Sequence, residues 1–209
     1  QAPLNLQLHG VIDRSQINLN FTRQVKIFKK DYTVTHIWVG GPLNKPNVSI
    51  DLYRNDVVID TVVLSGKENW THTWHNLDMN DALGNAYTYR FDLKETPKDY
   101  KKVTEDNNII STYTKKTSVN AKINWLGGPV VKPSTSITLY KNGKAYETVL
   151  LNQKNNWSHT WDNLEIYDDK GKLIQYTITQ MDVLKDYIAS IEGIFLREIA
   201  RFDVAFTIS

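Results

Sequence analysis

The 209-residue sequence has no cysteine, which excludes a disulfide framework, a zinc site built on thiolates and a thiol nucleophile. It also lacks a run of roughly 18 apolar residues, so we expect no membrane insertion in this fragment. The basic and apolar regions of a signal peptide are missing from its amino terminus. Because a chain that starts at Gln1 is typical of a processed or excised fragment, these absences leave the compartment open.

Charge of one sign is scarce as well. Lys and Arg number 25 against 23 Asp and Glu, and this net charge of +2 is too small for a nucleic-acid-binding surface. Long Ala, Leu and Glu stretches with a helical period are missing, whereas Thr, Val and Ile occur throughout, together with 6 Trp, 11 Tyr and 6 Phe. The composition therefore predicts an all-β fold.

Recognisable catalytic motifs are also missing from the sequence. There is no Gly-x-Ser-x-Gly elbow, His-Glu-x-x-His helix, phosphate-binding loop or dinucleotide fingerprint. No Ser, His and Asp set stands out by position. We expect a protein that is not an enzyme and that uses no cofactor.

What the sequence does contain is a long internal repeat. The Trp-Val-Gly-Gly-Pro segment at 38–42 returns as Trp-Leu-Gly-Gly-Pro at 125–129, a displacement of 87 residues. The displacement then holds without a gap, relating Lys45 to Lys132, Tyr53 to Tyr140, Trp70 to Trp157, Trp74 to Trp161 and Tyr89 to Tyr176. A period of this length indicates two copies of a whole domain, which we expect at residues 31–116 and 117–209.

Short alternating runs separated by turn residues fill each copy. In the second copy they cover 121–125, 136–140, 145–151, 157–161, 173–180 and 202–208. Between the second and third runs, Asn142-Gly143 tolerates the positive φ angles of a type I′ hairpin turn. This spacing is typical of a β-sandwich, so the chain is predicted to hold two tandem β-sandwich domains.

Residues 1–30 fit neither copy. Within them, residues 17–22 are similar to residues 202–207 at the end of the second copy and to residues 109–114 at the end of the first. Two interpretations stay open: the segment holds the closing strands of a preceding repeat, or it is an extension that pairs with an edge strand of the first domain. A two-stranded piece is not stable alone, so we expect it to dock in either case.

Several motifs follow one another in the same order in both copies. In the second copy they include Leu139-Tyr140-Lys141-Asn142-Gly143-Lys144, Asn156-Trp157, Asn163-Leu164 and the segment from Tyr167 to Thr179. This ordered set resembles the B-type repeat domain of the collagen adhesin Cna over roughly residues 31–209. The resemblance implies a prealbumin-like or inverse immunoglobulin topology and a place in a surface adhesin or pilin of a Gram-positive bacterium. It also implies that tandem copies serve as a stalk.

The resemblance further implies a cross-link, from which this sequence departs. Many members of the family form an intramolecular isopeptide bond between a Lys and an Asn, assisted by a buried Glu or Asp. Here the Lys position is occupied by His36 and Ile123, the acid position by Leu93 and Gln180, and the Asn position by Ser111 and Val204. The reaction needs an uncharged amine, an amide and an acid together, so we expect no isopeptide bond in either domain.

Two shifted registers do not restore the missing groups. Lys122 neighbours Ile123, but strand alternation is expected to point it toward solvent. Glu95 lies two residues after Leu93 and has no Lys at the matching place.

Two pairs of aromatic residues are candidate ligand contacts, namely Trp70 with Trp74 and Trp157 with Trp161. If one ring of each pair faced water, the pairs would form a platform for stacking sugars. The interpretation that we favour is packing in a core or at a domain junction.

Other polar motifs have structural interpretations. His72 and His159 stand between the paired Trp residues, and His75 is nearby, but no further ligands at matching spacing complete a metal site. The segment 168–171, Asp-Asp-Lys-Gly, is interpreted as a hairpin turn because the alternating oxygen ligands of a calcium loop are missing. The pair at 115–116, Lys-Lys, is interpreted as a short solvated linker.

The leading hypothesis is a stalk or spacer module of a cell-wall-anchored, extracellular adhesin or pilus subunit. The alternative is a binding module that contacts a host glycan or matrix protein through an exposed aromatic or edge-strand surface. A third hypothesis is an ancillary pilin whose amino-terminal strand pairs with a neighbouring pilus subunit. No hypothesis requires a metal, a cofactor or a nucleic acid.

Overall fold

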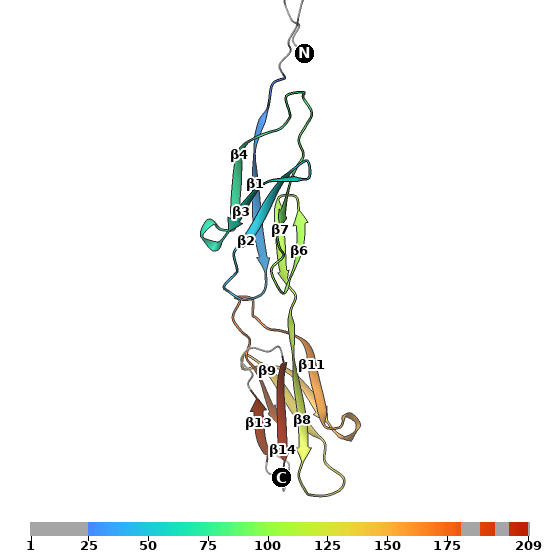
Figure 1. Cartoon of the computed structure of the whole chain (residues 1–209). Helices are drawn as coiled ribbons and strands as arrows, with labels where there is room; N and C mark the ends of the chain where they lie inside the picture. Colours follow the sequence, from blue (N-terminus) through green and yellow to red (C-terminus); the bar gives the residue numbers. More distant parts are fainter. Residues whose placement is uncertain (1–24, 181–188, 195–200, 209) are drawn as a thin grey trace, which may run out of the picture.

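The structure, a computed structural model, describes residues 25–180, 189–194 and 201–208. These residues form fourteen β-strands and two short 3₁₀ turns, arranged as two domains that follow one another along a long axis (Figure 1). The prediction of an all-β fold is therefore confirmed. Within the described ranges, no helix has the length and apolar character needed to cross a bilayer.

Domain 1 is a sandwich of two sheets. The first sheet has the strand order β4-β1-β7-β6, formed by Thr71–Asp78, Lys29–Val39, Asn108–Tyr113 and Tyr100–Glu105. The second has the order β3-β2-β5, formed by Val57–Leu64, Val48–Arg54 and Tyr89–Leu93, and a 3₁₀ turn, η1, covers Gly66–Glu68. Paired strands are antiparallel except β1 and β7, which are parallel.

Domain 2 repeats this arrangement strand for strand. Its first sheet has the order β11-β8-β14-β13, formed by Ser158–Glu165, Lys116–Trp125, Arg201–Ile208 and Ala189–Ile194. Its second sheet has the order β10-β9-β12, formed by Lys144–Leu151, Thr135–Lys141 and Tyr176–Gln180, and η2 covers Gln153–Asn155. Strands β8 and β14 are parallel, as β1 and β7 are. The repeat in the sequence is thus a repeat of the fold.

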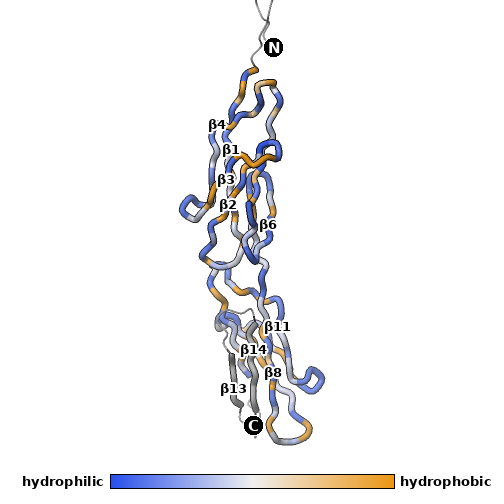
Figure 2. The backbone as a smooth tube through the Cα atoms, in the orientation of Figure 1, coloured by the Kyte–Doolittle hydropathy of each residue, from blue (hydrophilic) through white to orange (hydrophobic). Residues whose placement is uncertain are grey.

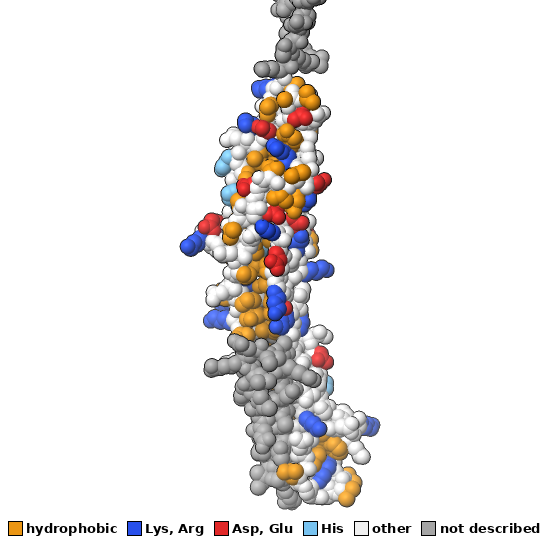
Figure 3. Space-filling view, viewed as in Figure 1, with side chains coloured by type: hydrophobic (Ala, Val, Ile, Leu, Met, Phe, Trp, Pro, Cys, Tyr) orange, Lys and Arg blue, Asp and Glu red, His pale blue; other side chains and the backbone are white. Residues whose placement is uncertain are grey.

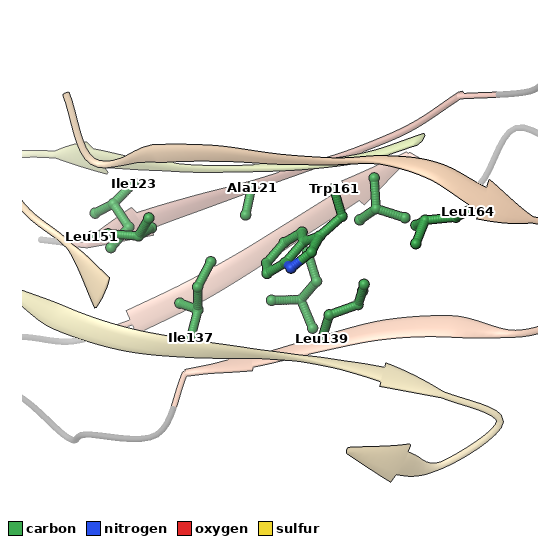
Figure 4. Close-up of a cluster of buried hydrophobic side chains, with 9 residues drawn as sticks. Ala121, Ile123, Ile137, Leu139, Leu151, Trp161 and Leu164 are labelled. Carbon is green, nitrogen blue, oxygen red and sulfur yellow. The ribbon is translucent and has the colours of Figure 1, made fainter. Parts of the chain in front are cut away.

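Each sandwich encloses one hydrophobic core, built by the inward-facing residues of both sheets. The core of domain 1 consists of Val34, Val48, Ile50, Leu52, Leu64, Trp74, Phe91, Leu93 and Ile109. The core of domain 2 consists of Val119, Ala121, Ile123, Ile137, Leu139, Leu151, Trp161, Leu164 and Ile178 (Figure 4). Burying one such aliphatic side chain contributes roughly 1.5–3 kcal/mol, so these cores are the main source of stability in a chain without disulfides.

Local backbone conformation confirms one expected turn and corrects one expected strand. Asn142 and Gly143 have φ angles of 51° and 77°, as the hairpin turn between β9 and β10 requires. The run expected at 157–161 starts one residue too early, because Trp157 has a φ angle of 46° and β11 begins at Ser158. Its counterpart Trp70 likewise has a φ angle of 59°, and β4 begins at Thr71. The left-handed conformation of Trp70 follows η1 and precedes the strand.

The chain passes from one domain to the next almost without a linker. Strand β7 ends at Tyr113 and β8 begins at Lys116. Of the Lys-Lys pair interpreted as a solvated linker, both residues are exposed, but Lys116 is the first residue of β8 and its ammonium group forms an ion pair with Glu165 on the neighbouring strand β11. Because β1 is parallel to β7 and β8 to β14, the chain enters and leaves each domain at opposite ends, which gives the elongated molecule of Figure 1.

Candidate functional site

In domain 1, the positions expected for Lys and Asn of the cross-link contact one another. His36 lies on β1 and Ser111 on the parallel neighbour β7, and their exposed fractions are 2% and 0%. His36 Nε2 lies 2.9 Å from Ser111 Oγ, within hydrogen-bonding distance. The two substituted positions are therefore joined by a buried hydrogen bond between side chains.

The surroundings of His36 keep its imidazole uncharged. Burial lowers the pKa of His36 from 6.5 to about 4. The ring of Trp38 lies edge-on to the imidazole at a centroid distance of 4.4 Å, and Trp70 lies at 6.2 Å. Leu93, at the acid position, is a member of the same core. A neutral imidazole, a hydroxyl and an aliphatic side chain hold neither the amine nor the amide that an isopeptide bond requires.

The contact between Ser111 and His36 is not a hydrolytic centre. A serine activated by a histidine must reach a substrate carbonyl, and Ser111 is fully buried. The pair is therefore a structural contact inside the sandwich.

In domain 2 the corresponding positions are filled in another way. Ile123 is a core residue with 4% exposure. Gln180 is half-buried, and its Nε2 donates a hydrogen bond of 3.0 Å to Thr135 Oγ1. Lys122 and Glu95, the residues of the shifted registers, are both exposed.

The register of the paired strands gives a different residue for the Asn position of domain 2. Ser111 pairs with Trp38 across β7 and β1, whereas the residue that pairs with Trp125, the counterpart of Trp38, is Ile208. Val204, which the sequence comparison placed at the Asn position, lies four residues earlier on β14. The counterpart of Ser111 is thus Ile208, which also carries no amide.

The four candidate tryptophans belong to the two cores or pack against them. Trp74 and Trp161 are core members with exposed fractions of 7% and 3%, and Trp70 and Trp157 are half-buried against the same clusters. Trp157 Nε1 also donates a hydrogen bond of 3.0 Å to the Pro133 carbonyl oxygen. Neither pair presents the exposed rings of a sugar-stacking platform.

The histidines between these tryptophans pack against the rings. His72 lies edge-on to Trp74 at 4.6 Å between centroids, and His159 lies edge-on to Trp161 at 4.7 Å. His75 pairs instead with Asp31, Nδ1 to Oδ2, at 2.8 Å. In the part of the chain that the structure describes, no group of three or more His, Asp or Glu side chains could hold a metal ion.

The segment 168–171 is a turn that closes on its own aspartate. Asp168 Oδ1 accepts hydrogen bonds from the backbone N–H groups of Lys170 and Lys172, both at 2.9 Å. The backbone hydrogen bond from Lys172 is the largest cause that lowers the pKa of Asp168. We call residues 168–172 the Asp turn of domain 2, and its counterpart, 81–85, the Asp turn of domain 1.

The Asp turn of domain 2 packs against domain 1. Residues 39–44, from the last residue of β1 onward, form what we call the apex loop of domain 1. It meets the turn where Leu43 N–H donates a hydrogen bond of 2.9 Å to the Gly171 carbonyl oxygen. Gly171 has a φ angle of +72°, and a Cβ added to it would lie 2.7 Å from Leu43 Cα and 2.9 Å from the carbonyl carbon of Pro42. Only glycine fits this close approach of two backbones.

An aromatic contact completes this joint between the domains. The ring of Tyr113, the last residue of β7, lies edge-on to Tyr167 of domain 2 at a centroid distance of 5.6 Å. Burial raises the pKa of Tyr113 to about 12, so its hydroxyl stays neutral. The joint therefore combines a backbone hydrogen bond, a close glycine contact and a ring contact.

A groove of about 820 Å³ runs beside the joint. Its lining includes Pro46, Lys94, Asp99, Tyr100 and Tyr167. The joint was not expected from the sequence, although the interpretation of residues 168–171 as a turn agrees with the structure. The one signal that pointed to it is Gly171, since a glycine at a turn tip permits a close backbone approach.

Comparisons with known proteins agree with the fold and the repeat. The sequence matches the family described as Cna protein B-type domain over residues 32–122 and 129–198. It is 31% identical over 157 residues to a collagen adhesin of Staphylococcus aureus, and the match covers 70% of this chain and 13% of that protein. The chain belongs to the Cna B-type domain family, and it spans only that 13% of the length of its curated relative.

Solved structures of the same kind are also similar. A single B repeat unit (B1) of the collagen binding surface protein (Cna) of Staphylococcus aureus has 23% identity and a TM-score of 0.39, covering 86% of this chain and 98% of that chain. Two B repeat units (B1B2) of the same protein have 22% identity and a TM-score of 0.38, covering 86% of this chain and 49% of that chain.

Proposed function

We propose that this chain is a stalk module of a bacterial surface adhesin or pilus subunit, which spaces a binding region from the cell wall and forms no isopeptide bond. The observation that carries the proposal is the path of the chain. It enters each domain on one of two parallel, adjacent strands and leaves on the other, at the opposite end. Each domain therefore adds its full length to the molecule (Figure 1).

The module is held by its cores and its joint instead of a covalent cross-link. His36 and Ser111 form a buried hydrogen bond at the positions of the lost Lys and Asn, and Leu93 extends the core at the position of the lost acid. The proposed role implies an extracellular location and requires no catalysis, metal or cofactor.

Intact mass spectrometry tests the absence of the cross-link. Each isopeptide bond releases one ammonia, so we expect the measured mass to equal the mass calculated from the sequence. A deficit of one ammonia would contradict the proposal for one domain, and a deficit of two for both.

A second candidate function is lateral binding of a host matrix protein through the edge strand β3. Three of its apolar residues, Val57, Ile59 and Val63, have exposed fractions of 65%, 38% and 61%. The counterparts on β10 are Lys144, Tyr146 and Leu150, so β10 differs from β3 at these three positions by one charged residue. Exposed apolar edge strands add partner strands readily, and charged edge strands do not.

This candidate is tested on a panel of immobilised matrix proteins. We expect any binding to be lost on Val57→Lys/Val63→Lys and to survive Leu150→Lys, a control on β10 where Leu150 has 53% exposure. Equal binding by both variants would exclude β3 as the contact.

A further inference from the structure

The joint between the two domains has two halves, and each half occurs a second time in the chain. In the joint, the apex loop of domain 1, residues 39–44, packs on the Asp turn of domain 2, residues 168–172. The 87-residue repeat places a second apex loop at 126–131, after β8, and a second Asp turn at 81–85. These two pieces lie at opposite ends of the molecule (Figure 1).

The apex loop of domain 2 already has the conformation that the joint requires. Gly127 and Gly128 have φ angles of 68° and 75°, against 67° and 78° for Gly40 and Gly41 in the joined loop. Both pairs of glycines are in the left-handed region that other residues avoid. The free loop is therefore preorganised, which lowers the entropic cost of docking.

A lysine fixes both apex loops in the same way. Lys45 Nζ donates a hydrogen bond to the Gly40 carbonyl oxygen, and Lys132 Nζ donates one to the Gly127 carbonyl oxygen. The shared geometry persists although, among the residues that the structure describes, only the first loop has a domain packed against it.

The free apex loop is markedly apolar. Leu126, Val130 and Val131 have exposed fractions of 55%, 99% and 81%. The loop after β8 is coloured as hydrophobic in part in Figure 2, and Figure 3 shows apolar side chains at this end of domain 2. Leu43, the counterpart of Val130, is 68% exposed in the joint. Neighbouring apolar side chains on a loop tip indicate a contact surface.

The two Asp turns differ in polarity, and the two apex loops differ in the same sense. The joined Asp turn has the polar tip Asp169-Lys170-Gly171, and the apex loop that meets it carries Asn44. The free Asp turn has the tip Ala82-Leu83-Gly84, with Leu83 83% exposed, and the free apex loop carries Val131 in place of Asn44. The joined Asp turn therefore has a polar tip and packs on a loop that carries Leu43 and Asn44, whereas the other Asp turn and the other apex loop are both apolar.

The free Asp turn also has the backbone of the joined one. Asp81 Oδ1 accepts hydrogen bonds from the N–H groups of Leu83 and Asn85 at 2.9 and 2.8 Å, the pattern found for Asp168. Gly84, with a φ angle of +92°, occupies the place of Gly171, and its described neighbour is the Val25 side chain, 3.4 Å from the position of an added Cβ.

From these features we infer that the apex loop of domain 2 docks onto the Asp turn of a further B-type repeat, one whose turn has an apolar tip like that of domain 1. The inference rests on the proposed stalk function. It names the partner surface: an Asp turn with Ala-Leu-Gly or a similar apolar tip.

A fusion of two copies supplies such a partner. In this fusion, the full chain is followed directly by residues 26–209 of a second copy. Ile208 of the first copy and Lys29 of the second copy are then as far apart in sequence as their counterparts, Ser111 and Lys116, are in the natural joint. The chain has no cysteine, so introduced cysteines carry spin labels only at chosen sites.

Two pairs of labels compare the new joint with the built one. Val57 and Lys144 are exposed and are repeat counterparts of each other. Val57→Cys and Lys144→Cys in one chain span the built joint, whereas Lys144→Cys in the first copy and Val57→Cys in the second span the new joint. Electron–electron double resonance then gives the distance distribution for each pair.

We expect both pairs to give the same narrow distribution. Val130→Asp/Val131→Asp in the first copy should broaden the distribution across the new joint alone, and Leu150→Asp, a control on β10, should leave it narrow. A broad distribution across the new joint that Val130→Asp/Val131→Asp does not change would overturn the inference. A broad distribution across the built joint would instead contradict the stalk function.

Discussion

At the scale of single residues, the distinctive feature of domain 1 is a titratable group inside its core. Domain 2 has Ile123 where domain 1 has His36, and both side chains are buried. The imidazole keeps one hydrogen bond, to Ser111, while its Nδ1 has no partner among the side chains and backbone that the structure describes. A buried polar atom without a partner lowers stability, so the imidazole is a weak point of domain 1 that Ile123 avoids at the matching position of domain 2.

This difference predicts that acid destabilises domain 1 first. The pKa of His36 is about 4 in the folded chain and 6.5 when exposed, so between these values the unfolded state binds a proton that the folded state does not. Stability should therefore fall as the pH drops from about 6.5 to about 4, by up to about 3 kcal/mol. Urea unfolding followed through the NMR signals of Val34 and Ile137 reports the two domains separately.

The matched control is His36→Ile/Ser111→Ala, which gives domain 1 the isoleucine of domain 2 and leaves no hydroxyl without a partner. This variant should lose the pH dependence between 6.5 and 4 and keep any dependence that comes from carboxylates. If domain 1 of the natural chain and of the variant showed the same slope, another group would be responsible.

At the scale of strands and turns, the sequence allowed the repeat, the sandwich and the core tryptophans to be predicted. The limits of strands were harder to predict where polar residues occupy them. The first half of β8 is Lys116-Thr117-Ser118-Val119-Asn120, which carries little apolar signal, yet Thr117 is 6% exposed and pairs with Leu164. Its position is determined by the neighbouring strand β11, a tertiary contact that local sequence does not encode.

The positions assigned to the cross-link from the sequence lie together in domain 1, whereas strand register gives another residue for one of them in domain 2. His36 and Ser111 contact one another because β1 and β7 are parallel neighbours whose register pairs Trp38 with Ser111. In domain 2, counting back from the final aromatic residue, Phe206, gave Val204 as the Asn position. Val204 lies four residues before Ile208, the residue that pairs with Trp125, because strand register depends on pairing with β8 and not on the spacing to an aromatic residue. The joint could not be predicted, because it brings together residues 43 and 171, which are far apart in the sequence.

The Asp turn of domain 2 gives a prediction about the joint. Gly171→Ala introduces a Cβ close to Leu43 Cα and Pro42, so the turn must withdraw from domain 1. We expect the distance distribution between labels at Val57 and Lys144 to broaden, while both domains stay folded by NMR.

A second glycine provides the control for backbone strain. Gly143 has a φ angle of +77°, similar to the +72° of Gly171, but a Cβ added there would meet nothing within 4 Å. Both alanine variants should lose roughly 1–2 kcal/mol of stability in domain 2 from the left-handed conformation. Only Gly171→Ala should loosen the joint. Equal distance distributions between the Val57 and Lys144 labels in the two variants would refute the role of the contact between Gly171 and Leu43.

At the scale of the whole molecule, the order of strands determines how a pulling force acts. A force along the long axis pulls the start of β1 and the end of β7 in opposite directions. These strands are parallel neighbours that pair over residues 35–39 and 108–112. Such a force slides one strand along the other, so it loads all the hydrogen bonds between them together instead of one after another. The same holds for β8 and β14 in domain 2.

This geometry predicts that domain 1 resists force differently along different directions. Attachment at the two ends of the chain shears β1 against β7. Attachment at Lys30→Cys and Met79→Cys, which lie at the same end of the antiparallel pair β1 and β4, peels the edge strand β4 away one hydrogen bond at a time. In single-molecule pulling we expect a several-fold higher unfolding force for the first attachment than for the second. Equal forces would show that the parallel strands do not bear the load, and a stalk would then gain nothing from this strand order.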